Sequence, residues 1–131
     1  MNILLVGENE EILYKWRYLL ELAHPNSSIL EGNAEVTKQY LHQYYHKTDL
    51  IVCLPTEPIH LLIEILTLSK KFDIPVLCVV TESLDSEILL LKEKGVQGII
   101  RQDTSINVLR NGIQFVKEKG TFWDPKVQIH S

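Results

Sequence analysis

The chain has 131 residues and a formal net charge of −4 at pH 7, with 45% apolar and 23% charged residues. This length and composition predict one globular domain and exclude a disordered chain, while the acidic balance excludes a basic nucleic-acid-binding surface on this segment. The amino-terminal segment lacks the basic residues that begin a signal peptide, and no apolar run approaches about 18 residues. We therefore expect neither a secretion signal nor a membrane span.

Five short apolar runs recur along the chain. They are rich in Val, Ile and Leu, which is typical of strands buried on both faces of a parallel sheet. We therefore expect strands at Ile3–Val6, Ser28–Leu30, Leu50–Leu54, Pro75–Val80 and Gln97–Ile100.

A stretch with helical spacing of apolar residues follows each run. We expect helices over residues 12–23, 34–45 and 56–71, from Ser83 as N-cap to Gly95, and from 103 or 104 to 119. Five such βα units, joined by right-handed crossovers, predict an α/β domain. Its core is a single doubly wound, five-stranded parallel sheet with helices on both faces.

The residues just after each predicted strand decide the chemistry, because ligands bind at the carboxyl ends of parallel strands. Glu8 and Glu10 could bind a cation, but the carboxylates of one loop are too few for a dedicated Mg²⁺ site. Neither GENEE (7–11) nor LPTEP (54–58) supplies a phosphate-binding glycine loop or a nucleophile with its base. We therefore predict no catalytic residue, no metal site and no cofactor.

Thr81 ends the fourth predicted strand, and VQGIIRQDTS runs from Val96 to Ser105. With the βα spacing, this pattern resembles the receiver domains of bacterial two-component response regulators. The segment from Gly95 to Val127 is most similar to the LuxR-type branch, in which a Gly-aromatic-Asp-Pro tail leads towards a helix-turn-helix. The resemblance implies a flavodoxin-like fold with strand order 2-1-3-4-5. It also implies a receiver-like domain over residues 1–120 and a tail, or the start of a linker, over residues 121–131.

The resemblance also implies a set of working positions. Receivers hold Mg²⁺ with two acidic residues and a phospho-acceptor aspartate, and bind the phosphoryl oxygens with a hydroxyl and a lysine. An aromatic switch residue lies on the fifth strand and falls here on Ile99. The positions of the acidic pair are occupied here by Gly7 and Glu8, and the position of the phospho-acceptor aspartate by Leu54. Thr81 stands at the position of the hydroxyl, and Gln102 at that of the lysine. Leu54 has no nucleophilic atom, so we predict a degenerate phosphorylation pocket and no enzymatic activity.

These positions predict a non-enzymatic regulatory domain in the cytoplasm. We expect it to be the N-terminal part of a LuxR-type transcriptional regulator, with a regulatory protein partner and no membrane contact. DNA would be bound only through a domain that this chain does not contain. One alternative is a small-molecule sensor whose vacated pocket is lined by Glu8, Thr81, Glu82 and Gln102. Another is a stand-alone protein-interaction adaptor.

The last predicted helix carries more apolar residues than one core requires. Ile106, Leu109, Ile113 and Val116 form the stripe expected to face the sheet. Val108 and Phe115, with Gly112 between them, form a second face, for which we expect a two-fold homodimer. The alternative is that Phe122 or Trp123 of the tail covers Phe115.

The two cysteines, Cys53 and Cys78, each stand inside an apolar run. This placement predicts buried free thiols in a reducing compartment. His42 and His46 have i, i+4 spacing that can bind zinc, but without a third ligand at a recognisable spacing a solvated helix face is expected.

Overall fold

The computed structural model describes residues 1–81 and 85–127. Its centre is a parallel sheet with strand order β2-β1-β3-β4-β5-β6, which confirms the predicted order of the first five strands and adds a sixth. The strands are β1 (Asn2–Val6), β2 (Ser28–Gly32), β3 (Leu50–Cys53), β4 (Val76–Val80), β5 (Gly98–Arg101) and β6 (Phe122–Trp123).

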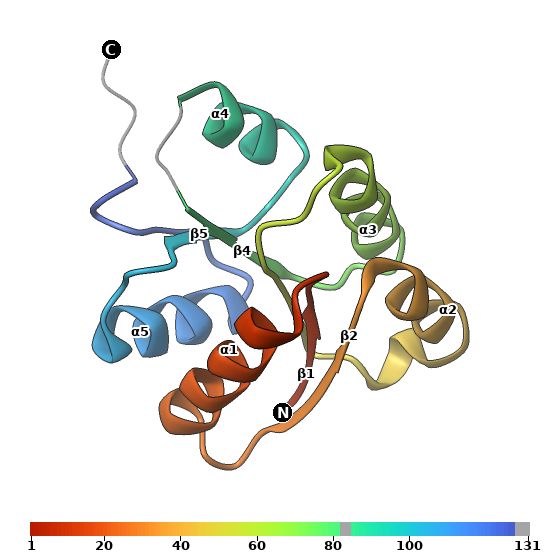
Figure 1. Cartoon of the computed structure of the whole chain (residues 1–131), viewed down its shortest axis with the longest axis horizontal. Helices are drawn as coiled ribbons and strands as arrows, with labels where there is room; N and C mark the ends of the chain where they lie inside the picture. Colours follow the sequence, from red (N-terminus) through yellow and green to blue (C-terminus); the bar gives the residue numbers. More distant parts are fainter. Residues whose placement is uncertain (82–84, 128–131) are drawn as a thin grey trace.

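Helices cover both faces of the sheet (Figure 1). They are α1 (Glu10–Ala23), α2 (Ala34–Tyr44), α3 (Ile59–Lys71), α4 (Asp85–Glu93) and α5 (Ile106–Lys117), with a short 3₁₀ turn, η1 (Tyr45–Lys47), after α2. Helices α1 and α5 pack on one face, and α2, α3 and α4 pack on the other. Within the described residues, no helix combines the length and hydropathy needed to cross a bilayer.

Side chains that accept hydrogen bonds from the first turn fix the starts of three helices. The Asn9 side chain accepts from α1, Asn33 from α2 and Ser105 from α5. Helix α5 therefore begins at Ile106, slightly later than predicted. The expected N-cap Ser83 lies outside the described residues.

The start of α3 also differs from the prediction, which placed Thr56 inside the helix. Pro58 has extended backbone angles and is the N-cap residue, so the helix begins at Ile59. The Thr56 hydroxyl donates to the Leu54 carbonyl at 2.8 Å and closes a turn before the helix.

Alternate residues of the central strands point into two separate apolar layers. Val52 and Leu54 belong to the layer under α1 and α5, whereas Cys53 and Cys78 belong to the layer under α3 and α4. The continuous apolar runs in the sequence reflect this burial on both sides of the sheet.

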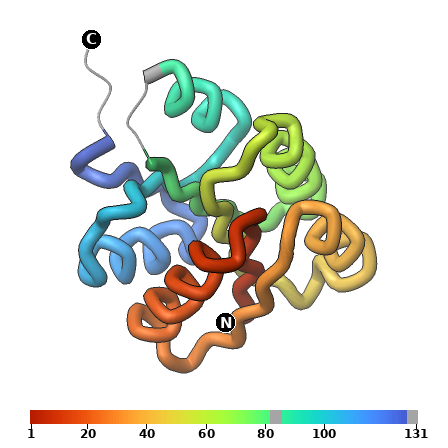
Figure 2. The backbone as a smooth tube through the Cα atoms, viewed as in Figure 1, coloured from red at the N-terminus to blue at the C-terminus, as the bar shows by residue number. Residues whose placement is uncertain are grey.

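The chain after α5 returns to the sheet and pairs with β5, as the tube in Figure 2 shows. The Phe122 amide donates to the Gln97 carbonyl, and the Asp124 amide donates to the Ile99 carbonyl, both at 2.8 Å. Val127 is buried in the layer under α4. Residues 122–127 thus pack against the sheet.

Candidate functional site

The ends of β1 and β3 bring Gly7 and Leu54 together. The Leu54 amide donates to the Val6 carbonyl at 2.8 Å, and the Leu54 side chain is only 2% exposed. A Cβ atom added at Gly7 would lie 3.0 Å from Cδ1 of Leu54 and 3.2 Å from Cδ2 of Leu13. Leu54 therefore fills the space beside Gly7 with an apolar contact, where the family resemblance assigns carboxylates.

Glu8 has a structural partner. Its Oε1 atom accepts a hydrogen bond from the backbone amide of Ala34, the first residue of α2, at 3.0 Å. A carboxylate at this helix end satisfies an otherwise unpaired amide and interacts favourably with the helix dipole. Sequence reasoning missed this contact because it joins residues that are 26 positions apart.

Thr81 and Gln102 also lie at the carboxyl edge of the sheet. Thr81 follows β4 and Gln102 follows β5, and both are exposed. The Gln102 amide donates to the Val80 carbonyl at 2.9 Å, so the two strand ends are side by side. Glu82, named with them in the sensor hypothesis, lies outside the described residues.

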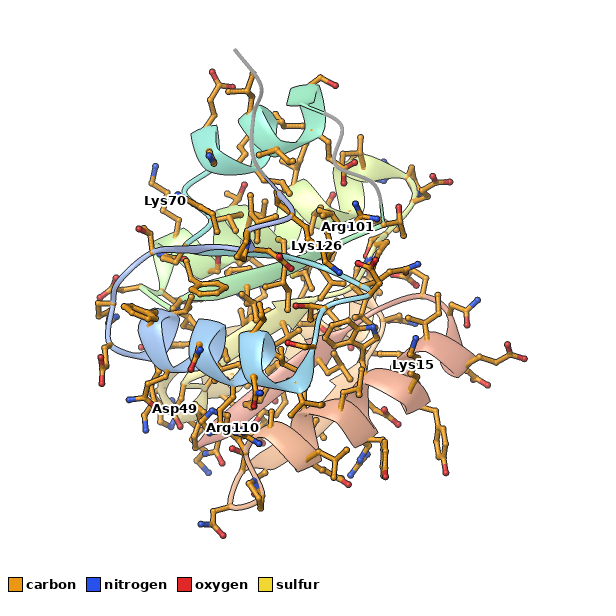
Figure 3. The ribbon with its side chains drawn as sticks, turned by 90° about the vertical axis from the view of Figure 1, so that its left-hand side faces the viewer. Lys15, Asp49, Lys70, Arg101, Arg110 and Lys126 are labelled. Carbon is orange, nitrogen blue, oxygen red and sulfur yellow. The ribbon has the colours of Figure 1, made fainter. Side chains whose placement is uncertain are left out.

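Charged groups gather beside the end of β5. Asp103 pairs with Nε of Arg101 at 3.2 Å and lies 3.8 Å from Nζ of Lys126. Figure 3 shows Arg101 and Lys126 close together, at the opposite end of the sheet from Asp49 and Lys70. Arg101 and Lys126 are therefore cations beside the end of β5, where Gln102 itself carries no charge.

A cavity of about 190 Å³ lies next to Leu54, between the residues that follow β3 and the end of β4 with Thr81. Pockets for drug-sized ligands start at about 300 Å³, so this cavity fits an ion or a very small solute. Thr81 lines it, but Glu8 and Gln102 do not. The residues of the sensor hypothesis are thus only partly brought together. Besides Thr81, the residues that line the cavity include Cys53, Leu54, Glu57, Cys78 and Glu87.

The two cysteines are buried free thiols, as the sequence predicted. A hydrogen bond with Cys53 and burial raise the pKa of the Cys78 thiol well above its usual range. The Cys78 thiol is therefore protonated at neutral pH and is a poor nucleophile.

The expected interface on α5 is partly occupied by the chain itself. A Cβ atom at Gly112 would lie 3.0 Å from Cδ2 of Phe122, and the Phe115 and Phe122 rings stack with centroids 6.0 Å apart. Gly112 is consequently not open to a second chain. Val108 is half-buried and Phe115 remains 52% exposed.

The two histidines on α2 and η1 contact aromatic rings. His42 meets the Phe72 ring edge-on, and His46 meets Tyr45 in the same way. Among the described residues, no group of three or more His, Cys, Asp or Glu side chains could hold a metal ion.

The strand order, the helices on both faces and the loops gathered at one edge are those of the flavodoxin-like receiver fold of response regulators. A LuxR-family two-component response regulator from Aurantimonas sp. matches with a TM-score of 0.80 and 17% identity, over 96% of this chain and 91% of that one. A LuxR-family DNA-binding response regulator from Silicibacter pomeroyi matches with a TM-score of 0.75 and 20% identity, over 98% and 99%.

The isolated REC domain of RcsB from Salmonella enterica serovar Typhimurium, solved with the phosphomimetic BeF₃⁻, matches with a TM-score of 0.77 and 12% identity, over 97% of this chain and 95% of that one. No protein-family model matches the sequence, and no curated protein matches it. At these identities the likeness establishes the receiver architecture, which confirms the predicted fold.

Proposed function

We propose that this chain is a non-enzymatic regulatory receiver-like domain that acts without phosphorylation. The observation that carries the proposal is the contact between Leu54 and Gly7 at the ends of β3 and β1. Aspartyl phosphorylation needs a carboxylate nucleophile and bound Mg²⁺. Leu54 offers no nucleophile, Gly7 offers no ligand, and the Glu8 carboxylate accepts a hydrogen bond from α2.

A receiver without this chemistry would act through protein contact. We propose that it is the N-terminal dimerisation and regulatory domain of a LuxR-type transcriptional regulator in the cytoplasm. Similarity to receiver domains of LuxR-family regulators, one of them described as DNA-binding, supports this role. DNA would then be contacted by a domain outside this chain, in keeping with the net charge of −4. A stand-alone adaptor for a regulatory protein partner is the alternative within the same class.

The α5 surface supports a homodimer contact made by fewer residues than the sequence predicted. Gly112 lies under Phe122, so the proposed homodimer contact is reduced to Phe115 and the half-buried Val108. A half-exposed phenylalanine on a surface helix is the kind of side chain that anchors a two-fold interface.

Incubation with acetyl phosphate and Mg²⁺ tests the proposal. Intact mass spectrometry is expected to show an unmodified chain, and a phosphorylated chain would refute the phosphorylation-independent role.

The second candidate is a small-solute sensor, and the cavity beside Leu54 favours it. A thermal-shift screen of inorganic ions and very small metabolites tests this function. A concentration-dependent rise in melting temperature, removed by filling the cavity with Thr81→Met, would support sensing. No shift with any compound would leave protein contact as the function.

A further inference from the structure

Cys53 and Cys78 form a matched pair on the two central strands. They are Cα partners in the parallel register of β3 and β4, and both side chains point into the same apolar layer. They are also the two cysteines of the whole sequence. Any chemistry that needs two thiols within one chain therefore has to occur here.

The strand register holds these thiols close together without favouring a disulfide. Side chains in register on neighbouring parallel strands project side by side, so their Cβ atoms keep the strand spacing of about 4.8 Å. A disulfide requires Cβ atoms about 3.5–4.5 Å apart. Direct S–S bonding would thus pull two central strands together, whereas an atom inserted between the sulfurs fits the spacing better.

The pair borders a space that an ion could enter. Both cysteines are lining residues of the cavity of about 190 Å³, whose lining also includes Leu62 of α3 and Leu91 of α4. Ile59, the first residue of α3, also lines it, so the amino-terminal end of that helix faces the cavity. The positive end of a helix dipole stabilises thiolate charge, although the Glu87 carboxylate on the same wall opposes it.

The ligand set selects the kind of ion. Zn²⁺ in proteins takes four ligands, and the part of the chain that the structure describes holds no group of three or more potential ligands. Sulfur ligands select soft cations, of which Cu(I) is the biological example. We propose that Cys53 and Cys78 form a two-coordinate site for one Cu(I) ion, independently of the function proposed above.

Binding exchanges protons for the metal. Each S–H bond is replaced by an S–Cu bond, two protons are released to solvent, and copper keeps its oxidation state. Because Cys53 and Cys78 stand on neighbouring strands, one residue from Leu54, an ion here would tie β3 to β4 near the carboxyl edge of the sheet.

The test uses the full chain, reduced and kept anaerobic, titrated with Cu(I) in the presence of the chromogenic chelator bathocuproine disulfonate. Native mass spectrometry then gives the stoichiometry. We expect one Cu(I) retained per chain, no Zn²⁺ retained under the same conditions, and loss of copper in both Cys53→Ala and Cys78→Ala. Leu66→Val, which alters the same apolar layer outside the cavity lining and keeps both thiols, is the matched control and should retain copper.

Cys53→Val and Cys78→Val provide a second pair of variants if the alanine variants do not fold, because valine suits a buried strand. Circular dichroism checks the fold of each. Failure of the native chain to retain Cu(I) would overturn the proposal. Equal retention by a single-thiol variant, or one copper shared between two chains, would do the same.

Discussion

Cδ1 of Leu54 lies 3.0 Å from the position that a Cβ atom would take at Gly7. The two residues end neighbouring strands, and Leu54 is buried in the layer under α1 and α5. The absence of a side chain at position 7 and the presence of a bulky one at position 54 are therefore coupled. Any carboxylate introduced at either position must displace this packing.

Leu54→Asp is expected to lower the free energy of unfolding by about 3 kcal/mol. The substitution removes buried methyl groups, which costs about 2–5 kcal/mol in cores, and places a carboxylate in an apolar layer. Urea denaturation measures the change, and Leu54→Met, which conserves volume, should cost less than about 1.5 kcal/mol.

The same Leu54→Asp variant is expected to be labelled weakly at best by acetyl phosphate, because Gly7 cannot share Mg²⁺ and Gln102 carries no charge. Strong Mg²⁺-dependent labelling of this single variant would show that a carboxylate at position 54 is enough for phosphorylation without changes at Gly7 and Gln102.

Asp124→Asn tests the attachment of the last strand. Asp124 is 2% exposed, and its carboxylate accepts hydrogen bonds from the amides of Arg101 and Lys126 at 3.0 and 2.9 Å. Weakening these charge-assisted bonds in a buried site should cost about 1–3 kcal/mol. Amide hydrogen exchange should rise in residues 122–127.

The matched control is Asp103→Asn, whose exposed ion pairs should contribute no more than about 1 kcal/mol. Equal effects of the two substitutions on exchange at β6 would show that Asp124 does not hold the segment in place.

His24 makes stability depend on pH. Burial lowers the pKa of His24, and the nearby charges of Lys117, Arg110 and the amino terminus lower it further, although a hydrogen bond with the Arg110 backbone opposes the shift. Among the described residues, its Nε2 atom has no hydrogen-bond partner. The unfolded chain therefore binds a proton more readily than the folded chain as the pH falls through about 6.5.

The stabilising contribution of neutral His24 is thus present above that pH and is lost below it. We expect His24→Gln to lose less stability than the native chain between neutral pH and about pH 5.5, measured by urea denaturation. An identical pH dependence for His24→Gln and the native chain would contradict the prediction.

Phe115→Glu is expected to dissociate a homodimer in sedimentation equilibrium. The substitution places a charge on the exposed part of α5, and loss of the ring contact with Phe122 should cost only about 0.5–1.5 kcal/mol of stability. Lys117→Glu, elsewhere on the same helix, is the control. A monomeric native chain at about 100 µM, well above typical specific affinities, would remove this interface.

The sequence predicted most of the sheet because each central strand is apolar on both faces, as in Leu50–Cys53 and Val76–Val80. It could not predict β6, because a strand of two residues is too short to show a pattern of apolar residues. Two further contacts depend on tertiary packing between separate segments of the chain. Phe122 covers Gly112, and the Ala34 amide at the start of α2 donates a hydrogen bond to the Glu8 carboxylate. In the candidate site, the family resemblance indicated that Leu54 occupies the phospho-acceptor position. The packing of Leu54 against Gly7 could be seen only in the structure.

We propose that the carboxyl edge of this receiver fold carries out no phosphoryl transfer. The most direct test is intact mass spectrometry of the native chain after incubation with acetyl phosphate and Mg²⁺, with a phosphorylatable receiver domain as positive control. We expect an unchanged mass, because Leu54 has no nucleophilic atom. A phosphoryl adduct on the native chain that is lost on treatment with hydroxylamine, as expected for an acyl phosphate, would contradict it.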